Sequence, residues 1–329
     1  MESEFRQDLV SGDWVLIAPV RGRKPHQFKI SVERTKRAPK KGCAFEHAGE
    51  QRGTGIISSY PSYKNWKTRL ILNKFPAVSR TKKSVAIAKK GPISTIAGYG
   101  YHEILVTRDH NNNFPELSYP DAVLVFQLLQ ARYLDFSKDK KIAYASLFHN
   151  WGLTAGASLY HPHYQLVAIP VIPPDVAHSL GGAEVYFKRH RKCVHCTQLG
   201  WERREKKRII AENKHAIAFC PFVSKEPFEM RVFPKGHHPS FEDTLENVLE
   251  DVVSVLQQSL KQLERALNYP DYNFLIHTTP VKDKKHYKNY HWHIEVVPRT
   301  TISAGFELGT AIEINPLDPD RAAAILKNV

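Results

Sequence analysis

The residues of this chain best suited to chemistry form the segment His161-Pro162-His163-Tyr164-Gln165. In an extended strand, His161 and His163 point to the same face, and Gln165 follows on that face two residues later. A neutral imidazole there can bind a metal ion, or it can attack phosphorus and hold a phosphoryl group covalently. The Gln165 amide offers an uncharged donor to a phosphate oxygen. Paired strand histidines are also often just packed or solvated, so the rest of the chain must decide between these interpretations.

The composition is that of an ordinary globular chain with excess positive charge. Its 329 residues are 42% hydrophobic and 24% charged, enough for one large domain or two smaller ones. No apolar run approaches a membrane span, and the N-terminus lacks the basic start and apolar core of a signal peptide. We therefore expect a cytoplasmic protein without a membrane segment. The formal charge of +14 favours nucleic acid or small phosphorylated substrates as partners, although a solvated basic surface explains many of the lysines.

The same order of features occurs twice along the chain. Each half carries two strand-like segments, a histidine, an apolar helix, another strand and a His-x-His pair. In the first half these are 68–75, 100–108, His110, 121–136, 142–149 and His161-x-His163. In the second half they are 215–220, 228–234, His237, 244–267, 272–277 and His291-x-His293. The repeated order predicts two copies of one α+β module.

Local signals place the helices and the boundary between the modules. The second helix keeps one apolar stripe at 3.6-residue spacing, and Asp243 with Glu246 resembles a capping box with Asp in place of Ser or Thr. Three prolines close the first module, and the segment 175–192 is expected to be the linker. The predicted domains are therefore 1–178 and 190–329.

Cysteine and histidine spacing in the second half predicts a metal site. Cys193-x-x-Cys196 with His237 and His291 makes the Cys2His2 set that tetrahedral zinc prefers. A redox pair is the alternative, but redox motifs open a helix after a strand, so a zinc knuckle is favoured. His195, between the two cysteines, is a further candidate ligand.

The duplication predicts a matching site in the first half, from Cys43, Glu46, His110 and His161. Glu46 stands where the second half has its second cysteine, and a carboxylate can bind zinc. His47 is an alternative to Glu46 as the fourth ligand. A lost or weakened site is the other interpretation of this departure.

These residues resemble the galactose-1-phosphate uridylyltransferase family of the histidine-triad superfamily, including a relative that transfers adenylyl from ADP-glucose to phosphate. The resemblance covers nearly the whole chain. Its most specific part is Asn150-x-Gly152-x-x-x-Gly156-x-Ser158-x-x-His161-Pro162-His163-x-Gln165. It implies an α+β fold of tandem duplicated histidine-triad-like modules, each a mostly antiparallel sheet with packed helices. It also implies two zinc sites, the second more regular than the first, and a homodimer.

The resemblance implies a role for each matching residue. His163 would be the nucleophile that takes up the nucleotidyl group. Gln165 and Ser158 would hold the transferred phosphoryl oxygens, and Asn150, Gly156 and Ala157 would shape the pocket. Arg21 and Lys24 would bind phosphate. Asn73 would bind the nucleoside, and Glu307 would contact the sugar hydroxyls. His161, His110 and Cys43 match zinc ligands of the first site.

Some departures leave the nucleotide and the sugar open. Tyr164 replaces the small residue typical of uridylyltransferases, and no glutamate downstream fits the iron ligand that some members use. The second metal site and the segment 305–316 resemble the plant adenylyltransferase-like branch, whereas the His-Pro-His motif favours uridylyl transfer. In the second module Glu295 stands where the first has Gln165, and a carboxylate would repel phosphate, so we expect that module to be inactive. His277 and His293 either line the sugar pocket or simply pack.

The expected activity is exchange of UMP between UDP-glucose and galactose 1-phosphate through a nucleotidyl-histidine, with these nucleotide-sugar and sugar-phosphate substrates as partners. Adenylyl transfer from ADP-glucose to phosphate and phosphorolysis of dinucleoside polyphosphates are the alternatives. A zinc-stabilised nucleic-acid-binding protein is the non-enzymatic alternative. The lysine runs lack the interleaved aromatic residues of single-strand binders, which argues against nucleic acid.

Overall fold

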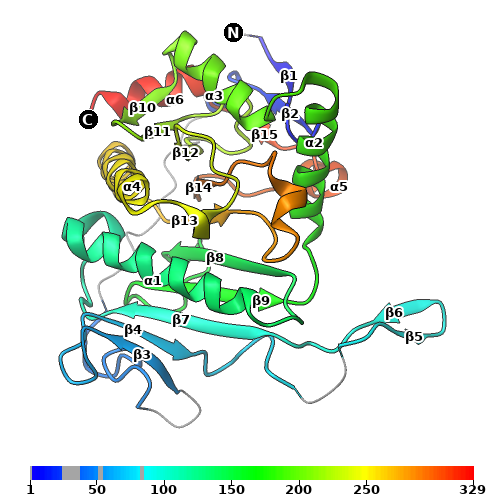
Figure 1. The fold of residues 1–329 in the computed structure, drawn as a ribbon. Coiled ribbons are helices and arrows are strands. Elements are labelled where there is room, and N and C mark those ends of the chain that lie inside the picture. Colours follow the sequence, from blue (N-terminus) through cyan, green and yellow to red (C-terminus); the bar gives the residue numbers. More distant parts are fainter. Residues whose placement is uncertain (1, 24–37, 51–54, 82–84) are drawn as a thin grey trace.

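Ten strands form one continuous antiparallel sheet in the computed structural model (Figure 1). The strand order is β10-β11-β12-β14-β13-β8-β9-β7-β4-β3. The strands of its first half are β3 (Ile56–Tyr60), β4 (Thr68–Leu72), β7 (Tyr101–Thr107), β8 (Tyr144–Trp151) and β9 (His163–Ile169). Those of the second half are β10 (Ile209–Glu212), β11 (Ala216–Phe219), β12 (Met230–Pro234), β13 (Tyr272–His277) and β14 (His293–Pro298). The structure describes residues 2–23, 38–50, 55–81 and 85–329, so the predicted phosphate ligand Lys24 lies outside it.

The two halves of the sheet repeat one topology. From its outer edge, the first half runs β3-β4-β7-β9-β8 and the second runs β10-β11-β12-β14-β13, so the fifth strand in sequence is fourth in space in both. Helix α1 (Tyr119–Ser137) follows the third strand of the first half, and α4 (Glu246–Leu267) follows the third strand of the second. We call these units the first and second module. The predicted α+β fold of tandem modules is confirmed.

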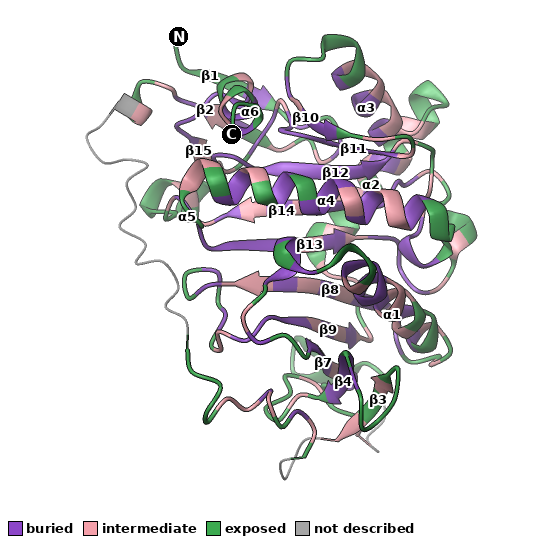
Figure 2. Ribbon diagram, turned by 90° about the vertical axis from the view of Figure 1, so that its left-hand side faces the viewer, coloured by how far each residue is buried: buried purple, intermediate pink, exposed green. Residues whose placement is uncertain are grey.

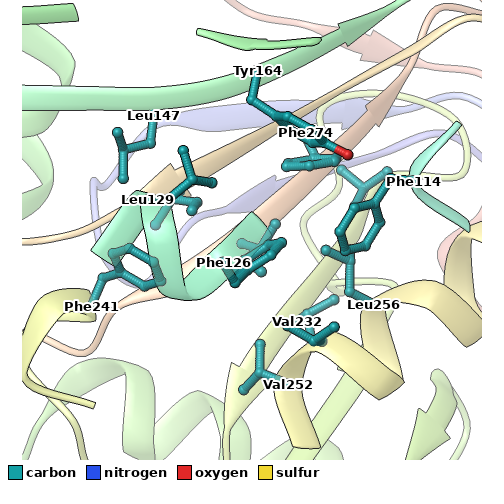
Figure 3. Packing of buried hydrophobic residues seen from close by; sticks show 14 of the residues in the cluster. Phe114, Phe126, Leu129, Leu147, Tyr164, Val232, Phe241, Val252, Leu256 and Phe274 are labelled. Atoms are coloured by element: carbon teal, nitrogen blue, oxygen red, sulfur yellow. The ribbon is translucent and has the colours of Figure 1, made fainter. Parts of the chain in front are cut away.

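The modules meet along the central strands. Strands β8 and β13 pair antiparallel, with Phe148 opposite Leu275. Helices α1 and α4 cover one face of the sheet (Figure 2). Beneath them lies a single apolar cluster in which Phe126 and Tyr164 of the first module pack with Phe274 of the second (Figure 3). The hydrophobic core is therefore shared between the two modules.

Alternation along β9 separates the core from the candidate site. Tyr164 and Leu166 are buried in the cluster under the helices. Successive strand residues point to opposite faces, so His163 and Gln165 face away from α1 and α4. The opposite face holds a smaller apolar cluster that includes Phe45 and Val106.

The start of α4 corrects one sequence prediction. The helix begins at Glu246, and its N-cap is Leu245. Asp243 instead ends a short 3-10 helix, η3 (Phe241–Asp243), and pairs with Lys284 at 2.9 Å. The buried Phe241 ring anchors η3 to the core, and this contact with a distant part of the chain overrides the local capping pattern.

The predicted linker is a helix. Residues Pro174–His190 form α2, with Pro174 at the first helical position, where the missing N–H costs nothing. Its buried Leu180 and Ala183 pack with Val10 and Tyr290. The segment belongs to a small apolar cluster, and so it is ordered rather than a loop. Helix α3 (Val194–Glu205) follows it.

A small sheet flanks the second module. Its strands are β1 (Glu4–Gln7), β2 (Trp14–Ile17) and β15 (Ile314–Asn315). Arg6 anchors it through a 2.8 Å contact with Asp318, which caps α6 (Pro319–Lys327). Helix α5 (Gly305–Thr310) precedes β15, and a hairpin of β5 (Ala88–Lys90) and β6 (Ile93–Thr95) projects from the first module (Figure 1). None of the described helices is long and apolar enough to span a membrane.

Candidate active site and metal centres

His163 opens β9 with its ring held in one orientation. The side chain is 5% exposed, and Nδ1 lies 2.9 Å from the carbonyl oxygen of His161. Because a carbonyl can only accept, Nδ1 carries the proton and donates it, which leaves the lone pair on Nε2. Burial lowers the pKa of His163 below its usual 6.5, so the ring is neutral at pH 7. A neutral imidazole with a lone pair at Nε2 is a competent nucleophile.

Two neighbouring rings support this histidine. The Phe45 ring lies against it with centroids 5.0 Å apart. From the helix side of the sheet, His149 Nδ1 lies 2.7 Å from the backbone carbonyl oxygen of His163. Burial lowers the pKa of His149 to about 3, so this ring is neutral and donates its Nδ1–H to that carbonyl. Both the ring and the backbone of His163 are therefore positioned.

Gln165 and Asn73 meet at one histidine that the sequence did not single out. The Oε1 of Gln165 lies 3.1 Å from Nε2 of His102, and Nδ2 of Asn73 lies 2.9 Å from the same nitrogen. Asn73 directly follows β4, and its Oδ1 accepts a 2.9 Å hydrogen bond from the backbone N–H of Phe75. The predicted phosphoryl and nucleoside ligands thus approach the same nitrogen of His102.

The loop between β8 and β9 is held by the second module. Asn273 of β13 donates from Nδ2 to Oδ1 of Asn150 and to the backbone oxygen of Ala155, both at 2.8 Å. Gly152 has a φ of +88°, and a Cβ there would overlap the Asp271 carboxylate, so only glycine fits. Gly156 has a φ of +85° and lies beside the Asn150 amide. Asn150 and the predicted Gly156 segment are therefore neighbours in space.

The remaining predicted substrate ligands lie in different surroundings. Ala157 is buried, donating its N–H to the Gly152 carbonyl, and Ser158 is exposed on the same loop. Arg21 begins a 3-10 turn after β2 of the small sheet, and Glu307 lies on α5 beside that sheet. No contact among the described residues joins either of these to His163. Their roles stay predictions.

Four potential metal ligands converge next to the candidate nucleophile, His163. The donor atoms of Cys43, His110 and His161 all lie within 4.8 Å of one another. Glu46 Oε1 is 2.9 Å from Nδ1 of His110 and 3.7 Å from Nδ1 of His161. His47 is 73% exposed and lies outside this cluster. Of the two candidates for the fourth ligand, the geometry favours Glu46.

The proton positions in this cluster call for a cation. His110 donates its Nε2–H to the Ala38 carbonyl at 2.8 Å, and His161 donates its Nε2–H to the Thr107 carbonyl at 2.7 Å. Their Nδ1 lone pairs therefore face each other at 3.2 Å. The buried Oε1 of Glu46 also lacks a hydrogen-bond donor among the described residues. Several electron pairs directed at one point without a proton between them fit a metal ion.

The second cluster contains the predicted Cys193, Cys196, His237 and His291. Cys196 Sγ lies 3.3 Å from Nδ1 of His237 and 3.4 Å from Nδ1 of His291. The hydrogen bond from Cys196, followed by those from the two histidines, lowers the pKa of Cys193, while the Cys193 thiolate raises the pKa of Cys196. A dication would favour deprotonation of both thiols, as in structural metal sites.

The surroundings of the cysteine pair differ from a knuckle. Cys193 is the N-cap of α3, and Cys196 lies in the first turn of that helix. The pair therefore opens a helix, as redox motifs do, but the preceding element is α2 rather than the strand that those motifs follow. His195 is turned away, with its ring 5.2 Å from that of His293. This leaves the predicted two cysteines and two histidines as the cluster.

The corresponding face of the second module is filled by its own side chains. The His293 ring stacks on Phe233 and on His277, with centroids 4.5 Å and 4.9 Å away. Glu295 lies 2.7 Å from Nε2 of His277 and 3.9 Å from Arg231. For His277 and His293 the structure favours packing, and this module has the carboxylate of Glu295 where the first module has the neutral amide of Gln165.

Sequence reasoning missed His102 and Asn273. Strand alternation places His102 on the face of Ile104, which pairs with Gln165, so the pattern of β7 contained a usable signal. Asn273 had none, because its partners lie across the junction of the two modules.

The fold and the relatives define a class, that of nucleotidyltransferases built here on two tandem α+β modules. Residues 1–173 match the family described as galactose-1-phosphate uridyl transferase, N-terminal domain, and residues 116–328 match the one described as domain of unknown function (DUF4921). The chain belongs to the galactose-1-phosphate uridyl transferase family.

Individual relatives cover most of the chain. The ADP-glucose phosphorylase of Arabidopsis thaliana is 32% identical over 99% of this chain and 93% of its own length. The galactose-1-phosphate uridylyltransferase of Thermotoga maritima is 27% identical over 78% of this chain and 82% of its own. A crystal structure of the A. thaliana ADP-glucose phosphorylase with bound ADP-glucose has a TM-score of 0.86 at 29% identity, covering 100% of this chain and 99% of that one.

Proposed function

We propose that this chain is a hexose-1-phosphate uridylyltransferase that moves UMP from UDP-glucose to galactose 1-phosphate through a nucleotidyl-His163 intermediate. The observation that carries the proposal is the neutral His163 ring, whose Nδ1–H is held by the His161 carbonyl at 2.9 Å. This leaves Nε2 as a nucleophile toward phosphorus. The family match and the uridylyltransferases among the relatives support the choice of substrates.

In the first half-reaction, the Nε2 lone pair of His163 attacks the α-phosphorus of the nucleotide sugar. The N–P bond forms as the bond from that phosphorus to the bridging oxygen breaks, and glucose 1-phosphate leaves with the electron pair. The ring then carries a positive charge. The His161 carbonyl stabilises that charge, because a hydrogen bond from a cationic donor is stronger than one from a neutral donor.

In the second half-reaction, a phosphate oxygen of the acceptor attacks the same phosphorus. The electron pair of the N–P bond returns to Nε2, and the neutral ring is restored, which gives ping-pong kinetics. Such transfer depends on positioning and on charge stabilisation. Gln165, Asn150 and the backbone of Ser158 would supply N–H donors, since the N–H groups of Gly156 and Ala157 already donate to carbonyls of their own loop. Arg21 and Lys24 would supply positive charge.

We assign zinc to both clusters. Cys193, Cys196, His237 and His291 form a Cys2His2 set, and the first cluster offers one cysteine, one carboxylate and two histidines. Four protein ligands close a tetrahedral site and leave no position for a reactive water, so both ions would be structural. Bound to His161, the first ion would fix the strand two residues before the nucleophile.

Phosphorolysis of ADP-glucose is the second candidate function. The observation that favours it is the match with the A. thaliana ADP-glucose phosphorylase, which extends over 99% of this chain at 32% identity. The chemistry at His163 would be the same. Inorganic phosphate would replace the hexose phosphate as the acceptor, and ADP would be the product.

Intact-protein mass spectrometry separates these candidates. The wild type is incubated with UDP-glucose or ADP-glucose alone, and the expected result is a gain of one uridylyl or one adenylyl group. Galactose 1-phosphate or phosphate is then added to find which acceptor removes the group. His163→Gly should acquire neither adduct while keeping its circular dichroism spectrum. An adduct on this variant contradicts the nucleophile assignment, and a wild type without any adduct contradicts the proposal as a whole.

A further inference from the structure

His102 lies at the centre of the hydrogen bonds that join the candidate site. It stands on β7 opposite Val167 of β9, half-buried, on the face that carries His163 and Gln165. Its polar contacts lead to Gln165, to Asn73 and to the backbone after Asn73. A histidine placed only for core packing would instead contact apolar side chains.

The proton of this ring has a defined position. The backbone N–H of Ala77 donates to Nδ1 of His102 at 3.0 Å, so Nδ1 must offer its lone pair. In a neutral imidazole the proton then lies on Nε2. The acceptor within reach is Oε1 of Gln165 at 3.1 Å. This hydrogen bond occupies the carbonyl oxygen of the Gln165 amide. The NH2 group of Gln165 is then left to donate to another partner.

The same reasoning applies to the neighbouring amide. Oδ1 of Asn73 accepts the N–H of Phe75, so the Asn73 NH2 group lies 2.9 Å from Nε2 of His102. The NH2 group of Asn73, the Nε2–H of His102 and the NH2 group of Gln165 thus lie in one region. The Oε1 of Gln165 is the acceptor among these three side chains that faces the donors. An oxygen of an anionic ligand entering there would accept from the amides and relieve the crowding of donors.

We propose that His102 is a positioning residue for nucleotidyl transfer, which fixes the Gln165 amide so that its NH2 group faces the transferred phosphoryl group. It also ties that amide to the Asn73–Ala77 segment. This inference rests on the proposed function, because it assumes that a phosphoryl group is transferred at His163. A freely rotating Gln165 would present its carbonyl oxygen to the phosphate for part of the time, and that orientation is repulsive.

The second module provides a natural contrast. Strand pairing makes Glu295 the counterpart of Gln165, and Arg231, opposite Glu295, the counterpart of Ile104. The counterpart of His102 is then Glu229, which lies 3.1 Å from Arg231. Contacts with Arg231 and His277 hold the second carboxylate, and no neutral amide is oriented. The amide-orienting arrangement therefore occurs in the module that carries the candidate nucleophile.

The test measures the rate of the first half-reaction in a double-mutant cycle. Single-turnover release of glucose 1-phosphate is followed for wild type, His102→Phe, Gln165→Ala and the double variant. Phe keeps a planar ring but cannot hydrogen bond, so His102→Phe should slow nucleotidylation by roughly 10-fold to 100-fold. In the Gln165→Ala background, His102→Phe should slow nucleotidylation by less than about threefold, because the amide that His102 orients is absent.

Two further variants separate positioning from packing. His102→Gln offers both an acceptor oxygen and an NH2 donor, so it should recover most of the lost rate. Tyr101→Phe is the matched control, since the neighbouring hydroxyl donates to Asp139 at 2.9 Å rather than to the site. Its nucleotidylation rate should stay within about threefold of the wild type.

The outcomes distinguish this inference from the proposed function. A wild type that forms no adduct overturns both. A wild type that forms the adduct at a rate unchanged by His102→Phe overturns only the role of His102. Full additivity of the His102 and Gln165 effects also overturns it, because His102 would then act independently of that amide.

Discussion

Backbone carbonyls set the state of the important histidines. His163 donates to the His161 carbonyl, and His161 donates to the Thr107 carbonyl. Each such bond fixes the proton on one ring nitrogen and leaves a lone pair on the other. The same kind of hydrogen bond therefore leaves His163 a lone pair for the proposed attack on phosphorus and leaves His161 a lone pair for the proposed metal ion. The difference lies in what the free nitrogen faces.

Buried His149 should make the protein sensitive to acid. Its pKa is lowered to about 3 in the folded protein. Below pH 6.5, His149 therefore binds a proton in the unfolded chain but not in the folded chain. The folded state therefore loses stability as the pH falls through 6.5, by roughly 2 kcal/mol at pH 5 from this residue alone. Denaturant unfolding between pH 7 and pH 5 measures the loss.

The matched variants are His149→Gln and His178→Gln. The first should flatten the dependence of the unfolding free energy on pH by about 1.4 kcal/mol per pH unit below pH 6. His178 is 56% exposed, so its substitution should leave the slope unchanged. Equal slopes for the wild type and His149→Gln would contradict the assignment of a neutral buried ring.

Glu46 should decide the metal content of the first cluster. Glu46→Ala removes one of four ligands next to His110 and His161, and we expect it to lose one of two zinc ions per chain. Inductively coupled plasma mass spectrometry on desalted protein gives the ratio. Glu46→Cys, which copies the second cluster, should retain both ions, and His47→Ala should have no effect. A wild type that binds one ion, with Glu46→Ala unchanged, would contradict the first site.

At the scale of elements, a strand of one module holds a loop of the other. Asn273 of β13 donates to Asn150 and to the loop carbonyl of Ala155, and its own Oδ1 accepts from Arg299 at 2.5 Å. The second module therefore holds the loop that precedes the candidate nucleophile. In the proposed function this contact would give the duplicated module a positioning role in the site.

Asn273→Ala tests this connection. The substitution leaves the Ala155 carbonyl and the Arg299 guanidinium without a buried partner, so we expect a loss of about 3 kcal/mol in unfolding free energy. Nucleotidylation should also slow by roughly 10-fold or more, because the loop is displaced. Asn273→Asp keeps an acceptor for Arg299 but removes the donors. Asn273→Asp should restore the unfolding free energy more than the nucleotidylation rate. Full recovery of the rate would contradict the role of the Asn273 donors in holding the loop.

At the scale of the whole molecule, the two modules form one structure. The sheet continues through the β8–β13 pair, and one apolar cluster contains buried residues of both modules. A cut between them would expose the edge of β8 and open the core beside Phe126 and Tyr164. Open edges and exposed cores favour aggregation.

The predicted domain 1–178 should therefore not fold when produced alone. We expect it to be insoluble or to lack dispersed amide signals in an NMR spectrum, whereas the full chain should unfold in a single cooperative transition. Circular dichroism and tryptophan fluorescence should give coincident unfolding curves. A stable, folded 1–178 fragment would contradict the shared core.

The predicted homodimer is a separate prediction, and sedimentation of the full chain tests it.

The sequence alone indicated the duplication, every member of the two ligand sets except the choice between Glu46 and His47, and the candidate nucleophile. Those features are local: strand alternation places His161 and His163 on one face, and the order of elements repeats within each half. Helices α1 and α4 also followed from apolar periodicity, within a few residues. Local spacing reports which residues share a face, because the backbone geometry is the same wherever the element lies.

Only the tertiary structure decided which segments meet. It joined the modules through β8 and β13, made the expected linker a helix, and placed Glu46 rather than His47 beside the histidines. It also revealed His102 and Asn273, whose hydrogen bonds connect separate segments of the chain. Such contacts depend on the packing of whole elements against one another, and no periodicity within a single segment encodes them.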